Sequence, residues 1–220
     1  MEKIDELKQK LCDMGLQLLN TRLTYGTCGN ISIRIPKQKK IIITPSGIPY
    51  HLVRPEDLVI VSFDNTIQGK QKPSLETPLH LEIYKKRDDL GSIIHTHSRY
   101  ALAVSAVKTF VPVFIDELFS HIGGDIAVVP YALPGSDELA ENTIKKLEDK
   151  NAVLLRNHGA VCCGANLQDT FQTAEAVETI CHIFILSTIL GEIKTLPEEG
   201  KEFQRALFDK KKYGQDTISL

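Results

Sequence analysis

A short apolar run that carries two histidines, Gly91 to His97, constrains the fold of this chain most strongly. The run is too apolar for a loop and too short for a helix, which favours a β-strand. In a strand His95 and His97 project to the same side, whereas in a helix they would diverge by roughly 200°. Two adjacent imidazoles suit a divalent metal, but His-x-His alone is equally typical of exposed or hydrogen-bonded histidines.

Hydrophobic periodicity along the rest of the chain predicts alternating helices and strands. The expected helices span 2–20, 73–87, 99–107, 136–149, 166–190 and 202–211. The expected strands span 30–35, 41–43, 58–63, 91–97, 111–114, 126–129 and 152–155, and 121–125 is expected to be a loop. No break resembles a domain boundary, so we predict one α/β domain over 1–220, a mixed sheet with helices on both faces, whose last part (191–220) is a linker and tail.

Three helix starts follow from capping residues. Ser136 is expected to cap the helix over 136–149. Ser74 is expected to be the N-cap of the helix over 73–87, whose first turn tolerates Pro78 and whose apolar seam is Leu75, Leu79 and Ile83. Asn166, with an aspartate three residues later, is expected to begin the long helix over 166–190.

Composition excludes several classes of partner. The 220 residues carry a net charge of −2 and no polybasic block, which gives no support for nucleic acid or an anionic membrane. The charged start of the chain lacks the apolar core of a signal peptide, and the most apolar stretch (183–190) is too short to span a bilayer. The five scattered cysteines are typical of reduced thiols, so we expect a cytoplasmic protein.

Two further residues complete a candidate metal site. Glu76 falls near the start of a helix, and His158 follows a buried strand and precedes a glycine. Three imidazoles and one carboxylate suit Zn²⁺ or a related divalent ion whose fourth ligand is displaced to open a catalytic position. A glutamate at a helix start and a His-Gly turn are also common without any metal.

Glycine and hydroxyl residues near three strand and helix ends indicate an anion site. Backbone amides in glycine turns, hydroxyls and a helix N-terminus are the groups that bind a phosphate monoester. Ordinary turns use the same residues. Neither the Walker motif nor the G-x-G-x-x-G motif is present, so a nucleotide is not expected. The candidates are Gly29, Asn30, Ser46, Gly47 and Ser74.

Taken in order, several segments resemble the class II aldolase/adducin family, and most closely its L-fuculose-1-phosphate aldolase type. The resemblance covers nearly the whole chain. The segments are Thr27 to Asn30, Ile33-Arg34, Ile43 to Tyr50, Lys72 to Glu76, His95 to His97, Asn157 to Gly159 and Lys212 to Gly214.

The resemblance implies a fold, an assembly and a set of roles. The fold would be α/β/α with a mixed, mostly antiparallel sheet, and the protein a homotetramer with sites near subunit interfaces. His95, His97 and His158 would bind zinc, or Mn²⁺, Fe²⁺ or Co²⁺, with Glu76 as both the fourth ligand and the general acid/base. The anion candidates would hold the phosphate of a sugar phosphate, and Tyr213 would act at the aldehyde end.

This chain departs from the family pattern at two places. Leu75 stands where the aldolases have a second serine, which removes one hydroxyl from the expected phosphate pocket. The segment 113–121 is one residue longer than in the L-fuculose-1-phosphate enzyme and offers no counterpart of its interface tyrosine. Asp116, Glu117 and His121 lie there without an assigned role.

The expected reaction is cleavage of a ketose 1-phosphate into dihydroxyacetone phosphate and an aldehyde. The metal would stabilise the enediolate left by the broken bond. Glu76, once displaced from the metal and surrounded by less polar groups, would have a raised pKa and move the proton. A dehydratase or decarboxylase of the family remains an alternative. Glu76 argues against a 4-epimerase, because that branch of the family resembles a pattern with aspartate at this position. The complete ligand set argues against a non-catalytic adducin-like module.

Overall fold

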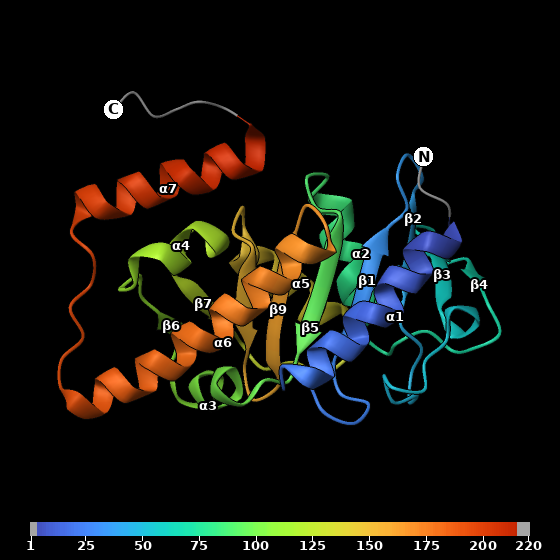
Figure 1. Ribbon diagram of the computed structural model, residues 1–220, viewed down its shortest axis with the longest axis horizontal. Coiled ribbons are helices and arrows are strands. Elements are labelled where there is room, and N and C mark those ends of the chain that lie inside the picture. Colours follow the sequence, from blue (N-terminus) through green and yellow to red (C-terminus); the bar gives the residue numbers. More distant parts are fainter. Residues whose placement is uncertain (1–3, 215–220) are drawn as a thin grey trace.

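The computed structural model describes residues 4–214, which form one nine-stranded sheet between two layers of helices (Figure 1). The strand order is β4-β3-β2-β1-β5-β9-β8-β7-β6. Among these strands β7 and β8 are the one parallel pair, so the sheet is mixed and mostly antiparallel, as expected. The strands are β1 Asn30–Arg34, β2 Lys40–Ile43, β3 Val59–Ser62, β4 Ile67–Gln68, β5 Ser92–Thr96, β6 Phe110–Val111, β7 Ile126–Val129, β8 Ala152–Leu155 and β9 Gly159–Gly164.

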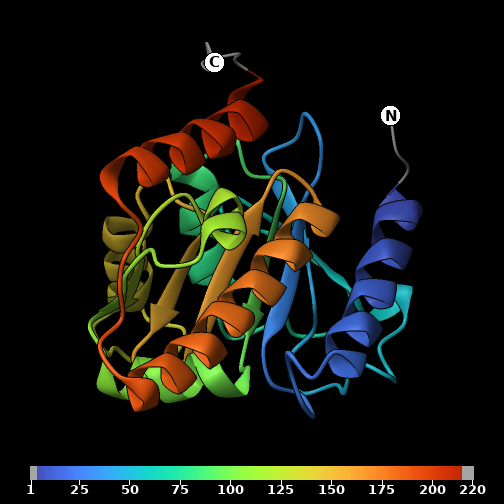
Figure 2. The same cartoon turned by 60° about the vertical axis from the view of Figure 1, so that its left-hand side comes forward.

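Helices cover both faces of this sheet. Alternate residues of the strands belong to two separate cores: Ile94 of β5 packs on one side and Ile93 on the other. Helices α1, α3, α4 and α6 cover the first side, where Figures 1 and 2 show α1 and α6 lying across the sheet, and α2 and α5 cover the second. The helices are α1 Ile4–Asn20, α2 Thr77–Lys86, α3 Arg99–Val107, α4 Asp116–Ile122, α5 Asp137–Leu147, α6 Leu167–Leu190 and α7 Glu198–Tyr213, with a 3₁₀ turn at Pro55–Asp57.

Capping chemistry was predicted correctly for two helices. Asn166 accepts a hydrogen bond from the Asp169 amide at the start of α6, and the Ser136 hydroxyl accepts one from the Leu139 amide at the start of α5. Both residues have extended backbone, so their side chains satisfy amides that have no intrahelical partner.

The start of α2 was predicted wrongly. Its N-cap is Glu76 rather than Ser74, since the Ser74 amide donates to the Thr44 carbonyl and holds this segment extended. Leu75 is therefore outside the helix and 66% exposed, whereas Leu79 and Ile83 are buried as expected. Pro78 does lie in the first turn, where its missing amide proton costs nothing.

Four other elements differ from the sequence prediction. Residues 121–125 are not all loop: α4 ends at Ile122 and is closed by Gly123 in the left-handed conformation. The edge strand over 111–114 stops at Val111 because Pro112 has no amide proton to donate. The buried strand β9 was missed because its small residues hide the period of two, and α7 begins at Glu198 rather than near 202.

Helix α6 is the one helix among residues 4–214 long and apolar enough, by length and composition, to cross a membrane. It extends well beyond the apolar stretch 183–190. Buried side chains along its length, including Phe171, Val177 and Phe184, belong to the core on one face of the sheet. Helix α6 is therefore a core helix packed against the sheet.

Gly15 in α1 gives a stability prediction. A Cβ built there would lie 2.5 Å from Cδ1 of the buried Tyr50 ring, so the ring occupies the space that a side chain would need. We expect Gly15→Ala to lower the free energy of unfolding by about 1–3 kcal/mol, measured by urea denaturation.

Gly200 in α7 is the matched control. A Cβ there would meet its nearest neighbour at 3.7 Å, an ordinary contact. Gly200→Ala is therefore expected to be neutral or to stabilise by up to about 1 kcal/mol. Equal effects of the two substitutions would contradict the packing argument.

Candidate metal centre and anion-binding loops

The two histidines of the His-x-His run converge at the end of β5. His95 is fully buried in the strand, and His97 follows directly after it and is partly exposed. Their Nε2 atoms are 2.9 Å apart. The strand interpretation of this run is confirmed, and its period of two places both rings on one side.

The turn between β8 and β9 brings His158 to the same place. Asn157 has a positive φ of 56°, and the His158 amide donates to the Leu155 carbonyl, which closes the turn. A Cβ on Gly159 would lie 2.1 Å from the Thr96 carbonyl oxygen, so only glycine allows this turn to approach β5. The His158 ring centroid lies 4.8 Å from that of His95 and 5.1 Å from that of His97.

Glu76 reaches the histidines from the start of α2. Its carboxylate is buried, with Oε2 3.1 Å from His95 Nε2 and Oε1 3.4 Å from His158 Nε2. The Asn30 amide donates to Oε2 at 2.8 Å. Oε1 has no hydrogen-bond partner within residues 4–214, so one buried oxygen remains available to a ligand.

The chemistry of these donors fits a cation. His95 Nδ1 is 3.0 Å from the Ala160 carbonyl, to which it donates, so Nε2 of the neutral ring carries a lone pair. That lone pair faces the lone pairs of a carboxylate oxygen at 3.1 Å, an arrangement that a positive ion between them would stabilise. His95, His97 and His158 offer ligand atoms within 4.8 Å of one another and form a group that could hold a metal.

Burial keeps the imidazoles of His97 and His158 neutral. It is the main cause of the lowered pKa of His97, to about 3, and His95 and His158 lower it further. Burial likewise lowers the pKa of His158. Only neutral imidazole binds a metal, so these two rings are ready ligands at neutral pH.

In this structure the pKa of Glu76 is that of a carboxylate in contact with the histidines, whereas the raised pKa is expected for the carboxylate displaced from the metal. Burial acts to raise it, but His95, His158 and the Asn30 amide together outweigh burial, so the pKa of Glu76 is lowered rather than raised. The sequence predicts Glu76 beside the imidazoles, and the structure gives it contacts with two of them, His95 and His158. A raised pKa would require Glu76 to move away from them.

Backbone pairing brings the anion candidates together from three distant segments. The Ser46 amide donates to the Lys72 carbonyl, the Ser74 amide donates to the Thr44 carbonyl, and Pro45 and Pro73 form a β-bridge. The Thr44 hydroxyl accepts from the Ile31 amide, which ties this pair of segments to the loop before β1.

Gly29 shows how closely that loop approaches the histidines. Its φ is 73°, and a Cβ there would lie 2.4 Å from the His95 carbonyl oxygen. Asn30 follows it and pairs with His95 across β1 and β5. Gly47 also has a positive φ, of 76°, and its amide lies in an exposed turn. The five anion candidates therefore border the segment that carries Glu76.

Tyr213 is not brought to the histidines of its own chain. It ends α7, where the preceding Lys212 pairs with Asp89 at 3.4 Å, just before β5 begins. The histidines lie at the other end of β5. The longer segment 113–121 makes its contacts with other parts of the chain. Asp116 and Glu117 are on α4, and Asp116 accepts from the side-chain amide of Gln204 in α7. The His121 carbonyl accepts from the side-chain amide of Asn151.

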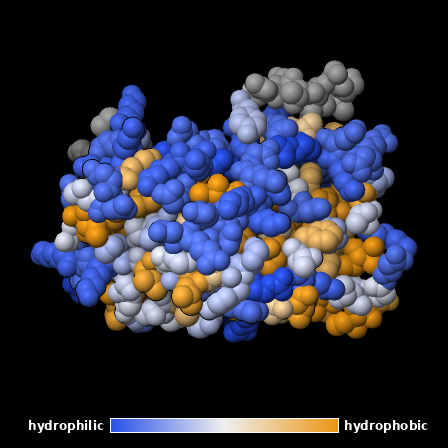
Figure 3. All heavy atoms as spheres, turned by 180° about the vertical axis from the view of Figure 1, so that it is seen from behind, coloured by the Kyte–Doolittle hydropathy of each residue, from blue (hydrophilic) through white to orange (hydrophobic). Residues whose placement is uncertain are grey.

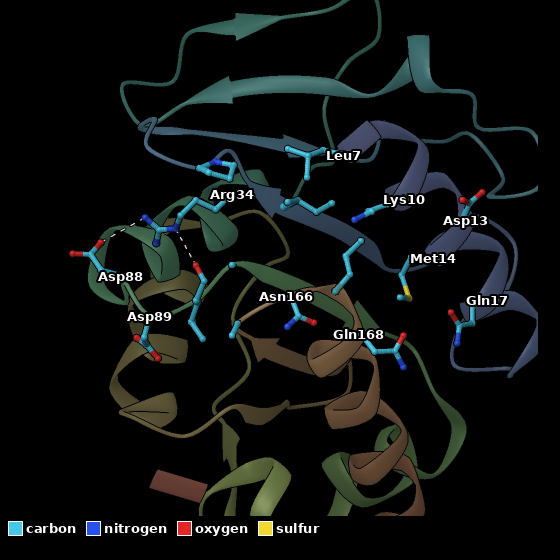
Figure 4. Close-up of a pocket in the computed structure, with 16 residues that line it drawn as sticks. Leu7, Lys10, Asp13, Met14, Gln17, Arg34, Asp88, Asp89, Asn166 and Gln168 are labelled. Atoms are coloured by element: carbon cyan, nitrogen blue, oxygen red, sulfur yellow. Dashed lines mark hydrogen bonds and ion pairs between the residues drawn. The ribbon is translucent and has the colours of Figure 1, made fainter. Parts of the chain in front are cut away.

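A cavity of about 640 Å³ lies away from this cluster (Figure 4). It is bordered by α1, β1, the α2–β5 loop and the start of α6, and includes Lys10, Arg34 and Asp88. Gly91, at the start of β5, lines it, whereas the histidines lie at the opposite end of that strand. Arg34 is held there by the Leu90, Tyr84 and Arg87 carbonyls, a structural role.

Two residues near the candidate centre were not anticipated from the sequence. The Tyr25 ring lies edge-on to His97 with centroids 6.5 Å apart, and no local pattern indicated it. His80 is fully buried one helical turn after Glu76. Its spacing of four from Glu76 was a usable signal, since such residues share a helix face.

The fold, the arrangement of the candidate metal-binding side chains and the sequence point to one class of protein. A sequence profile described as Class II Aldolase and Adducin N-terminal domain matches residues 9–185, and the chain belongs to this family. It is 35% identical over 209 residues to a 5-deoxy-D-ribulose 1-phosphate aldolase of Bacillus thuringiensis serovar kurstaki, covering 94% of this chain and 97% of that protein.

Two further relatives lie in the same part of the family. An L-fuculose phosphate aldolase of Haemophilus influenzae is 34% identical over 197 residues, covering 88% of this chain and 89% of that protein. A solved structure of an L-fuculose 1-phosphate aldolase superposes with a TM-score of 0.88 at 35% identity and covers 92% of this chain and 95% of that one. The predicted resemblance and fold class are confirmed.

Proposed function

We propose that this protein cleaves a ketose 1-phosphate by a retro-aldol reaction into dihydroxyacetone phosphate and an aldehyde. The observation that carries the proposal is the contact of one buried carboxylate, Glu76, with two of three convergent imidazoles beside glycine and serine loops. Relatives are named for 5-deoxyribulose phosphate and for fuculose phosphate. These two sugar phosphates share a short apolar end, which supports a substrate of that kind.

Glu76 is proposed as the general acid/base. Its Oε2 is held by the Asn30 amide, while Oε1 lacks a hydrogen-bond partner in residues 4–214. When substrate oxygens take its place beside His95 and His158, the carboxylate loses the contacts that lower its pKa. It then remains buried near the reacting carbons, where it takes or returns a proton.

The three histidines are proposed to hold Zn²⁺, with Mn²⁺, Fe²⁺ or Co²⁺ as alternatives of similar ligand preference. A divalent cation there would offset the negative charge that develops on the substrate oxygens as the carbon–carbon bond breaks. The chain contributes the orientation: the Ala160 carbonyl fixes the ring of His95, and the turn at Asn157 fixes His158.

The phosphate is proposed to bind at Gly29, Asn30, Ser46, Gly47 and Ser74. The amide of the exposed Gly47, the hydroxyl of the exposed Ser46 and the buried hydroxyl of Ser74 are suitable donors. The exposed Leu75 adds no hydroxyl, so this chain has fewer side-chain donors than the serine-containing pattern.

Assembly as a homotetramer in the cytoplasm completes the proposal. The last turns of α6 expose the apolar side chains of Ile183, Leu186, Ile189 and Leu190, the last two 76% and 89% exposed. Seen from behind in Figure 3, apolar side chains gather at the lower right, over the end of α6. Tyr213, distant from its own centre, is proposed to act at that of a neighbouring subunit. A molar mass about four times the 24.5 kDa of the chain tests the assembly.

Proton exchange in dihydroxyacetone phosphate tests the proposed reaction. The metal-loaded protein in D₂O is expected to remove the proton signal of the reacting hydroxymethyl group, and EDTA is expected to abolish that exchange. Nuclear magnetic resonance follows the signal directly. No exchange at full metal occupancy would contradict an aldolase and favour a decarboxylase or dehydratase, and no bound metal would contradict the enzyme.

Leu75→Ser is expected to strengthen phosphate binding. Leu75 is 66% exposed, so its replacement costs little stability, and a serine would restore a hydroxyl beside Ser74. We expect KM for dihydroxyacetone phosphate in the exchange assay to fall about threefold to tenfold, since a typical hydrogen bond contributes about 1 kcal/mol net.

Leu52→Ser is the matched control for this substitution. Leu52 is 57% exposed and outside the anion loops. Its replacement should leave KM unchanged. If KM is unchanged for Leu75→Ser as well, Leu75 does not border the phosphate.

A further inference from the structure

Polar side chains connect β1 to α2 on the side of the sheet that carries Glu76. Asn30 and Ser32 lie on one face of β1, and Glu76, His80 and Tyr84 follow at spacings of four along one face of α2. All five are buried. We name these five residues the β1–α2 ladder.

The contacts of the ladder are short and specific. Asn30 Nδ2 donates to Glu76 Oε2 at 2.8 Å. Ser32 Oγ lies 2.7 Å from His80 Nδ1 and 3.0 Å from the Tyr84 hydroxyl, which also donates to the Ser32 carbonyl at 3.1 Å. These contacts form two groups, Asn30 with Glu76 and Ser32 with His80 and Tyr84, and His80 follows Glu76 by one helical turn.

His80 is the member whose hydrogen bonding is incomplete. Its side chain is 0% exposed, and Nε2 has no hydrogen-bond partner within residues 4–214. Burial lowers its pKa to about 3, so the ring is neutral and one nitrogen carries the hydrogen. A buried ring nitrogen without a partner is costly, which points to a partner in another state of the site.

Glu76 is the group that this nitrogen can serve. Helical side chains lean toward the N-terminus, so the ring of His80 covers the turn that begins at Glu76. The two groups are close enough to interact: the Glu76 carboxylate acts to raise the pKa of His80, although burial outweighs it. Glu76 Oε1 is likewise buried and without a hydrogen bond in the described chain.

We propose that His80 is a positioning residue for Glu76. In this arrangement the Tyr84 hydroxyl shares its one hydrogen between the Ser32 carbonyl and Ser32 Oγ, which leaves the Ser32 hydroxyl to donate to His80 Nδ1. Nε2 then carries the hydrogen and donates it to the carboxylate once substrate displaces Glu76 from His95 and His158. The inference rests on the proposed function, because Glu76 needs a second position only if substrate takes its first one. No proton changes owner in this step, since one hydrogen bond replaces two contacts of the resting carboxylate.

Two substitutions at His80 separate its nitrogens. Asparagine keeps a polar atom near the position of Nδ1 and removes Nε2, whereas glutamine places an amide nitrogen near Nε2. We expect His80→Asn to lower the maximal rate of dihydroxyacetone phosphate exchange about 30-fold with KM within about threefold. His80→Gln is expected to recover the rate to within about threefold of wild type.

Tyr84→Phe is the control for lost stability. It removes a buried hydroxyl from the same ladder and leaves Ser32 with His80 as its side-chain partner. Its melting temperature should fall while its exchange rate and metal content stay near those of wild type. If His80→Asn and Tyr84→Phe have equal exchange rates, His80 is only structural and the proposal fails.

Nitrogen-15 resonance of the metal-loaded wild-type protein tests the hydrogen position without any turnover. The expected signals show hydrogen on Nε2 and an accepting Nδ1 at His80, and the opposite tautomer overturns the proposal. Wild-type protein that binds metal but exchanges no proton would refute the proposed function instead. In that case the tautomer would still show whether His80 Nε2 carries the hydrogen. Failure of the proposed function and failure of the His80 proposal are therefore distinguishable.

Discussion

Glu76→Gln is expected to lower turnover by at least about 10³-fold, a loss of about 4 kcal/mol in transition-state stabilisation, while metal stays bound. Glutamine matches glutamate in size and can still accept from the Asn30 amide, but it cannot take or return a proton. His95, His97 and His158 are unchanged and retain the ion. Proton exchange and retro-aldol cleavage measure turnover, and elemental analysis measures metal content.

Glu82→Gln is the matched control on the same helix. Glu82 pairs with Lys85 at 2.6 Å on the surface of α2 and does not contact the histidines. Its replacement should leave turnover within about twofold of wild type. If Glu76→Gln also retains turnover to within about tenfold, only about 1.4 kcal/mol is lost and Glu76 is not the acid/base.

His97→Ala is expected to reduce bound metal from about one ion per chain to a small fraction and to lower turnover by a similarly large factor. His97 is partly exposed, so the substitution removes a ligand without opening a cavity in the core. His51→Ala, at an exposed position outside the cluster, should change neither quantity. Full metal content after His97→Ala would contradict the proposed ligand set.

The pH dependence of metal content gives the same prediction a second readout. Protons compete with metal for an imidazole only as the pH falls toward its pKa, and burial lowers the pKa of His97 to about 3. The wild-type protein is therefore expected to retain metal at about pH 5, below the ordinary pKa of histidine. Complete release near pH 6.5 would show that the rings titrate as if exposed.

Local sequence patterns predicted the elements that carry the candidate ligands. A period of two placed His95 and His97 on one side of β5, a buried run ended just before His158, and capping residues located α5 and α6. These features depend on residues a few positions apart, whose side-chain directions follow from backbone geometry alone.

Tertiary pairing changed what the same patterns implied at the start of α2. The Thr44 carbonyl takes the Ser74 amide, so the helix begins later, Glu76 becomes its N-cap and Leu75 faces solvent. A partner thirty residues away cannot be inferred from capping preference, since several segments compete for the same amide.

The sequence by itself determined the family and most of the helices and strands, but not β4, α4 or β9. Only the tertiary structure decided that Asn30 pairs with His95, that the Ala160 carbonyl holds the His95 ring, and that Glu76 reaches two imidazoles. It also separated Tyr213 from its own centre and placed His80 beneath Glu76 in the ladder. These contacts join segments tens of residues apart, and their register is set by packing across the sheet rather than by any local period.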